Sequence, residues 1–355
     1  MGEAAAAMRD ARRAGFVRRM LAGLVALVLL LPAAAAADAG PNPLAVARDL
    51  RRGAELMRDA VALEFALTEA SRWFDDVLAT GIDGGEAAMN ARAVQQRALP
   101  AIADLEARLR VYAPGLKPRP PLYPLRGQSL RLLADYPAYL RRLSGILAVQ
   151  AEAAGSADTK ALESLAESWL ATSEVWFDRF YHVINAELAQ MPTDSPEHFA
   201  LRIAAEDFRV ARAERRLVEA LDPVTARARL ITLGEAQERF GLRVAAARAA
   251  AEALMPAYRD GLARLFAPLV GETEAAARAD AAMSVLRAQF ALYDESVAIS
   301  RARLGLFFLW TQDPQDPGLP RRWAEISARI AALSARLGAA QVAYFTALAP
   351  PEEDP

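Results

Sequence analysis

Residues 162–188 read LESLAESWLATSEVWFDRFYHVINAEL. At 100° per residue, the large apolar side chains of this stretch fall within one arc of about 160°. Charged and polar side chains, among them Glu167, Thr172 and Asn185, fill the opposite side. This segregation is typical of a helix that packs one face against the core of a soluble protein. The stretch therefore predicts a long amphipathic helix.

The same kind of sequence continues on both sides of this stretch. The chain has 355 residues, of which 54% are hydrophobic and 24% charged, and 82 are alanine. Segments rich in Ala, Leu, Arg and Glu, which favour helices, are separated by short stretches with Gly or Pro. These breaks fall at residues 81–85, 114–124, 155–158, 191–196, 221–223, 256, 271 and 311–320. No segment alternates apolar and polar residues as a strand would.

The sequence therefore predicts an all-α fold. We expect an elongated bundle of about seven to nine long, mostly antiparallel helices, arranged as one bundle or as two stacked bundles. The helical body is expected to span residues 38–349, with a subdivision near 191–196 as an open alternative. Residues 350–355 are acidic and are expected to form a disordered tail.

The N-terminus has the pattern of a secretory signal peptide. Five arginines precede residue 20, and Met20 to Leu31 reads MLAGLVALVLLL, without a charge. Small residues follow, so residues 1–37 are expected to be a signal peptide that is cleaved after Ala37 or Ala39. The body would then be periplasmic or secreted. The alternative is that residues 20–37 are retained as a membrane anchor, although they barely reach the length of a spanning helix.

Composition excludes several classes of function. The chain has no cysteine and two histidines, which argues against disulfides, iron–sulfur clusters and imidazole-rich metal sites, and we expect no cofactor. A net charge of −2 argues against a nucleic-acid-binding protein. Arginine strongly outnumbers lysine, which is present only at Lys117 and Lys160, as is typical of a GC-rich bacterial genome.

A polar seam interrupts the apolar face of the helix predicted over residues 44–80. It consists of Glu64, Thr68, Ser71 and Asp75, spaced i, i+4, i+7 and i+11. Carboxylates on a buried face need partners from a neighbouring helix or access to water. The seam therefore indicates either interhelical hydrogen bonding or the lining of a ligand site.

The segment from about 272 to 310 is apolar nearly all the way round, which predicts a central, mostly buried helix. It also carries Asp294, Glu295, Arg301 and Arg303. Such charges are either structural ion pairs or groups that bind a polar or anionic ligand. We expect the seam to face these arginines, so that the eight residues form one internal ligand-binding cluster.

A weaker candidate is a metal site on the helix of residues 162–188. Glu174, Asp178 and His182 are spaced i, i+4 and i+8, so their side chains share one side of the helix. The same arrangement also describes an ordinary solvated face.

No motif of a known catalytic class is present, which favours a non-enzymatic role without deciding the question. We expect an exported helical protein of the periplasm or cell envelope that acts as a protein-interaction or scaffold component. One alternative is a periplasmic protein that binds a small ligand or metal at the internal Glu/Asp/Arg cluster. Another is the extracytoplasmic part of a membrane-anchored sensor. An exposed apolar stripe on the helix from Trp323 to Leu348 would favour a protein partner.

Overall fold

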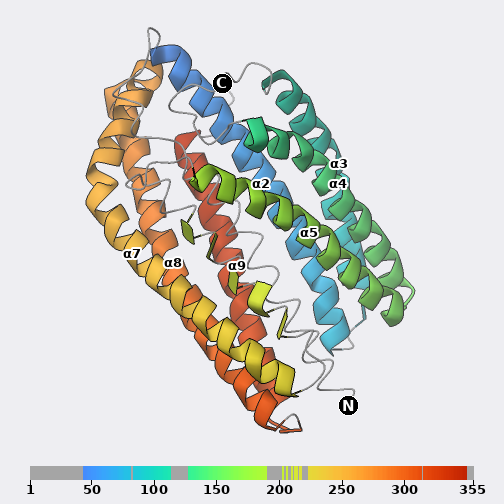
Figure 1. The fold of residues 1–355 in the computed structure, drawn as a ribbon. Helices are drawn as coiled ribbons and strands as arrows, with labels where there is room; N and C mark the ends of the chain where they lie inside the picture. The colour runs from blue at the N-terminus through green and yellow to red at the C-terminus, as the bar shows by residue number, and fades with distance from the viewer. Residues whose placement is uncertain are drawn as a thin grey trace.

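A computed structural model describes residues 43–80, 83–112, 127–189, parts of 202–217, 223–313 and 315–349. All regular secondary structure in these residues is helical (Figure 1). The long helices are α2 (Pro43–Thr80), α3 (Gly85–Tyr112), α4 (Gly127–Gly155), α5 (Thr159–Leu188), α7 (Pro223–Val270), α8 (Glu272–Gln312) and α9 (Leu319–Leu348). The predicted all-α bundle is therefore confirmed.

The breaks that the sequence predicts mostly coincide with helix ends. Helix α2 ends before the glycines at 81–85, and α4 ends at Gly155. Gly271 alone separates α7 from α8, and it has a φ of +86°, a backbone conformation that favours glycine over residues with a side chain. The signal peptide, the break at 191–196 and the acidic tail lie outside the described residues.

The predicted break at Pro256 is wrong. Pro256 lies inside α7, which runs without interruption for 48 residues. Pro100 in α3 and Pro137 in α4 likewise lie inside their helices. A proline inside a helix removes one backbone hydrogen bond and tends to bend the axis. Pro256 is exposed, whereas Met255 and Tyr258 in the same turn are buried, so α7 stays packed through this position. Tertiary packing here outweighs the local preference of proline.

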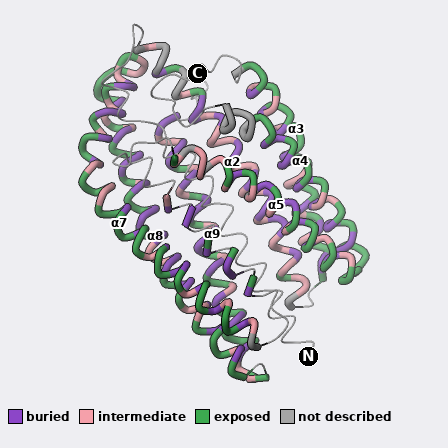
Figure 2. The backbone as a smooth tube through the Cα atoms, viewed as in Figure 1, coloured by how far each residue is buried: buried purple, intermediate pink, exposed green. Residues whose placement is uncertain are grey.

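The helices form two groups that share one core. Helices α2, α3, α4 and α5 pack together, and α7 and α9 flank α8 (Figure 1). The groups meet where α2 packs against α9 and α7. Buried residues line the inner faces of both groups, and exposed residues cover the outer faces (Figure 2). Among the described helices, none combines the length and the hydropathy that crossing a bilayer requires.

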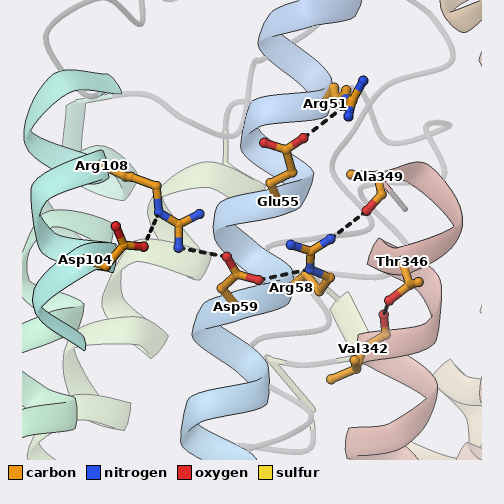
Figure 3. Close-up of polar contacts among 9 residues, drawn as sticks. All are labelled: Arg51, Glu55, Arg58, Asp59, Asp104, Arg108, Val342, Thr346 and Ala349. Carbon is orange, nitrogen blue, oxygen red and sulfur yellow. Dashed lines mark hydrogen bonds and ion pairs between the residues drawn. The ribbon is translucent and has the colours of Figure 1, made fainter. Parts of the chain in front are cut away.

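Hydrogen bonds reinforce the junction between α2 and its neighbours (Figure 3). The Arg58 guanidinium bonds to Asp59 and donates to the carbonyl oxygen of Ala349 at the end of α9, 2.8 Å away. Asp59 in turn accepts a hydrogen bond of 2.7 Å from Arg108 on α3. These contacts connect α3, α2 and α9 at one level of the bundle.

Candidate functional site

The polar seam of α2 is buried, and Glu64 lies at its centre. Glu64 is 3% exposed. The hydroxyl of Tyr136 donates to its Oε2, and the hydroxyl of Tyr139 donates to its Oε1 over 3.2 Å. Both tyrosines project from consecutive turns of α4, so one carboxyl group bonds to two turns of a neighbouring helix. The apolar periodicity of α2 places Glu64 on the inward face, where only a polar partner from another helix can satisfy it.

Aromatic rings enclose this carboxyl group. The ring of Trp176 on α5 stacks on Tyr139 with 4.9 Å between centroids and 10° between planes, and it lies 5.2 Å from the Tyr136 ring. We call Glu64, Tyr136, Tyr139 and Trp176 the Glu64 cluster. The three rings contact one another, so the cluster is a packed joint between α2, α4 and α5.

The surroundings of Glu64 change its chemistry. Desolvation by burial raises the pKa of Glu64 to about 8, although the Tyr139 hydrogen bond opposes the shift. Burial also raises the pKa of Tyr139 well above its usual value, and the nearby Glu64 adds to that shift. The carboxyl group of Glu64 is therefore largely protonated at neutral pH.

A second residue of the seam, Ser71, also contacts α4. Thr68 and Ser71 are buried, and the Ser71 hydroxyl donates to Oε1 of Gln150 over 3.1 Å. Asp75, at the end of the seam, is half-buried. Of the two readings that the sequence left open for this seam, interhelical hydrogen bonding is therefore what the structure displays at Glu64 and Ser71.

A second buried polar group lies on α8. The Arg303 side chain is 2% exposed, and its Nη1 donates to Oε2 of Glu214 over 2.7 Å. The Arg303 guanidinium also lies over the ring of Phe307, 5.9 Å from its centroid. We call Arg303 and Glu214 the Arg303 pair. Glu214 belongs to the partly described segment 202–217, so this pair joins that segment to the C-terminal group of helices.

The expected single cluster of eight residues is therefore wrong. Glu64 bonds to α4, whereas Arg303 bonds to Glu214. Glu295 is on the outer side of α8, where it accepts a hydrogen bond of 2.6 Å from Arg336 on α9. Arg301 is exposed, and its guanidinium lies against Gly241 on α7.

Asp294 is likewise directed outward, toward Arg248 on α7. The reason is geometric. Helix α8 packs against α7 and α9, and one side of α8, which includes Ala298 and Gly305, stays exposed to solvent. The prediction of a mostly buried helix holds for one side, and Asp294, Glu295 and Arg301 lie on the other.

A further polar feature, which was not predicted from the sequence, lies between α8 and α9. Each helix has polar side chains at every seventh position. They are Gln289, Ser296 and Arg303 on α8, and Ser327, Ser334 and Gln341 on α9. All but Ser327 are buried.

The rings of Phe307 and Trp323 pack with 4.9 Å between centroids. The same antiparallel register sets Gln289 level with Gln341 and Ser296 level with Ser334. Polar residues at core positions of packed helices restrict the register in which the helices fit. The seven-residue spacing is visible in the sequence and could have revealed this seam.

In the predicted metal site on α5, Asp178 forms an ion pair with an arginine of the protein, Arg212. Oδ1 of Asp178 accepts a hydrogen bond of 2.7 Å from Arg212, which also lies over the ring of Tyr181. His182 is exposed. Within the part of the chain that the structure describes, no three His, Asp or Glu side chains converge as metal ligands would.

We therefore expect chelators and added divalent cations to leave the thermal unfolding temperature of the protein unchanged. To bind a metal ion, the Asp178 carboxylate would have to give up its hydrogen bond with Arg212. A metal ion that did bind the folded state would raise the unfolding temperature as the metal concentration increased. Differential scanning calorimetry with EDTA, and separately with Zn²⁺, Mn²⁺ and Ca²⁺, measures this. If a metal ion raises the unfolding temperature of the wild type but not of Asp178→Asn, the predicted metal site exists after all.

Comparison with protein-family models, with curated proteins and with solved structures finds no significant match to this chain.

Proposed function

We propose that this chain is an exported helical protein of the bacterial cell envelope, and that it acts by binding a protein partner rather than by catalysis. The signal-peptide pattern of residues 1–37 supports export, and the composition of the chain supports a bacterial origin.

The observation that carries the proposal is how the buried polar side chains are used. Glu64 bonds to two tyrosines, Ser71 bonds to Gln150, and Arg303 bonds to Glu214. Buried polar groups that satisfy one another fix the arrangement of the helices. A function in binding is then expected on the surface.

The surface offers apolar side chains on α7 and α8 rather than on α9. The apolar stripe of α9 faces inward, with Trp323 buried. Gly234 on α7 lies against the Leu304 side chain. Ile231 lies one turn before Gly234, and Phe308 one turn after Leu304, so the two lie at the same end of the α7–α8 hairpin. Ile231 is 67% exposed and Phe308 53% exposed. Exposed apolar groups of this kind are candidates for a protein interface.

We expect the tagged protein to retain a partner from the envelope fraction after chemical crosslinking. Replacing Ile231 and Phe308 together by glutamate should reduce that retention about tenfold or more, because a buried charge opposes an apolar interface. Val175→Glu is the matched control, since Val175 is 61% exposed on α5, in the other group of helices. Retention of no protein above the level of the tag alone would contradict the proposal.

The two alternatives lead to different results. A small-ligand protein built on the internal charged residues would show a thermal shift with an anion or polar metabolite, and Glu64→Gln or Arg303→Met would abolish it. The separation of the Glu64 cluster from the Arg303 pair gives no support to one shared site. An anchored sensor would keep residues 20–37, whereas a secreted protein would have the intact mass of a chain that begins at Asp38 or Gly40.

A further inference from the structure

The outer face of α3 is exposed and uncharged over six turns. Helix α3 packs against α4 and α2, and seven residues on its free side fall within an arc of about 80°. All seven are exposed, and they are Met89, Ala93, Gln96, Pro100, Ala103, Ala107 and Val111. We call them the α3 face. Met89 is 64% exposed and Val111 82% exposed, and Leu99 beside them is 46% exposed.

The seven residues of the α3 face carry no charge, although 24% of the residues of the protein are charged. The residues of the α3 face are spaced three or four apart, which is the spacing of the residues along which two helices pack. The alanines among them would allow a second helix to approach closely. Charged side chains flank the α3 face, as they flank the apolar positions of paired helices.

The charges that flank the α3 face indicate which molecule would bind it. Arg97 and Asp104 are seven residues apart, so they lie on the same flank of the α3 face. One precedes Pro100 along the helix and the other follows it. In an antiparallel pair of α3 helices with a twofold axis near Pro100, Arg97 of each copy lies opposite Asp104 of the other. Leu99, on the opposite flank, then lies near Leu99 of the second copy. The α3 face is therefore complementary to itself in charge.

We propose that the α3 face binds the α3 face of a second copy of this chain, in an antiparallel arrangement around Pro100. In the single chain, Arg97 donates to the carbonyl oxygen of Ala93, and Asp104 forms a surface ion pair of 2.8 Å with Arg108 (Figure 3). Ion pairs at such exposed positions contribute little to stability, so both side chains can turn toward a second copy.

The proposal is independent of the envelope partner proposed above, which involves α7 and α8. Failure of self-association would leave that partner untouched, and failure of partner capture would leave this inference untouched.

A charge exchange tests the arrangement. The exported protein should sediment as a dimer at tens of micromolar in analytical ultracentrifugation. Arg97→Asp and Asp104→Arg should each weaken the dimer about tenfold or more, because each sets like charges opposite one another. The double variant Arg97→Asp/Asp104→Arg should restore the dimer, because both ion pairs reform with their signs exchanged. Arg243→Asp, at an exposed arginine of α7, is the control for charge reversal away from the α3 face.

A crosslink gives a second readout. Because the chain has no cysteine, Leu99→Cys introduces a single thiol close to the expected twofold axis. It should form an intermolecular disulfide under mild oxidation, whereas Leu242→Cys, at a comparably exposed leucine of α7, should not. A protein that is monomeric at every concentration, or a double variant as monomeric as the single ones, would overturn the proposal.

Discussion

Replacing Arg303 by methionine is expected to lower the free energy of unfolding by about 3–5 kcal/mol. The substitution keeps most of the side-chain volume but removes the cation that bonds to Glu214 over 2.7 Å. Both side chains are almost completely buried, so Glu214 would have to remain in the core without this cation or take up a proton. Either outcome destabilises the folded state. Urea denaturation followed by circular dichroism measures the loss.

Two further variants separate the ion pair from the volume of the side chain. Arg301→Met removes an exposed arginine two residues away on the same helix, so the free energy of unfolding should change by less than about 0.5 kcal/mol. Arg303→Met combined with Glu214→Leu removes both charges and should recover most of the stability, because paired apolar residues often replace a buried ion pair without loss. If Arg303→Met costs no more than Arg301→Met, the Arg303 pair is not a stabilising contact.

Acidification is expected to stabilise the protein through Glu64. The pKa of Glu64 is about 8 in the folded state, against 4.5 for an unperturbed glutamate. Below pH 4.5 the Glu64 carboxyl group is protonated in both the folded and the unfolded state, so ionisation of Glu64 does not lower the free energy of unfolding. Between pH 4.5 and 8 only the folded state holds the proton, so the free energy of unfolding falls by about 1.4 kcal/mol per pH unit as the pH rises. Above the folded-state pKa no further loss follows.

Glu64→Gln should remove this dependence. Glutamine keeps an oxygen that can accept from a tyrosine and carries no charge, so the variant should exceed the wild type by about 3 kcal/mol at pH 7 and match it near pH 4.5. Glu55→Gln is the control, since Glu55 lies on the same helix in a surface ion pair with Arg51. Parallel stability–pH curves for the wild type and Glu64→Gln would contradict the expected burial of an ionising carboxyl group.

The fold class follows from the sequence because it depends on local information. The apolar arc of residues 162–188 and the glycine-containing breaks are properties of single segments, and α5 indeed buries Trp169, Trp176 and Phe180. Thr172 is an exception. It lies on the polar side of the helical wheel but is buried, because the arc that neighbours cover on α5 is wider than its apolar arc.

The partners of the polar residues could not be predicted in the same way. Periodicity places Glu64 on the inward face of α2, but it does not say whether α4 or α8 lies opposite. Glu214, the partner of Arg303, is 89 residues away in the chain, in a segment with no sequence feature that connects it to α8. The seam between α8 and α9 is different, since its seven-residue spacing was available in the sequence.

The contact between α2 and α9 has a consequence for the order of folding. Arg58 and Ala349 are 291 residues apart in the chain, so the pairing of these helices closes a very long loop. At about 5–20 residues per second, ribosomes need about 15–60 s to make the chain between them. Throughout that interval the side of α2 that packs against α9 has no native neighbour to cover it. Folding of this protein is therefore expected to finish only after synthesis, and a holding chaperone that binds nascent α2 should raise its yield.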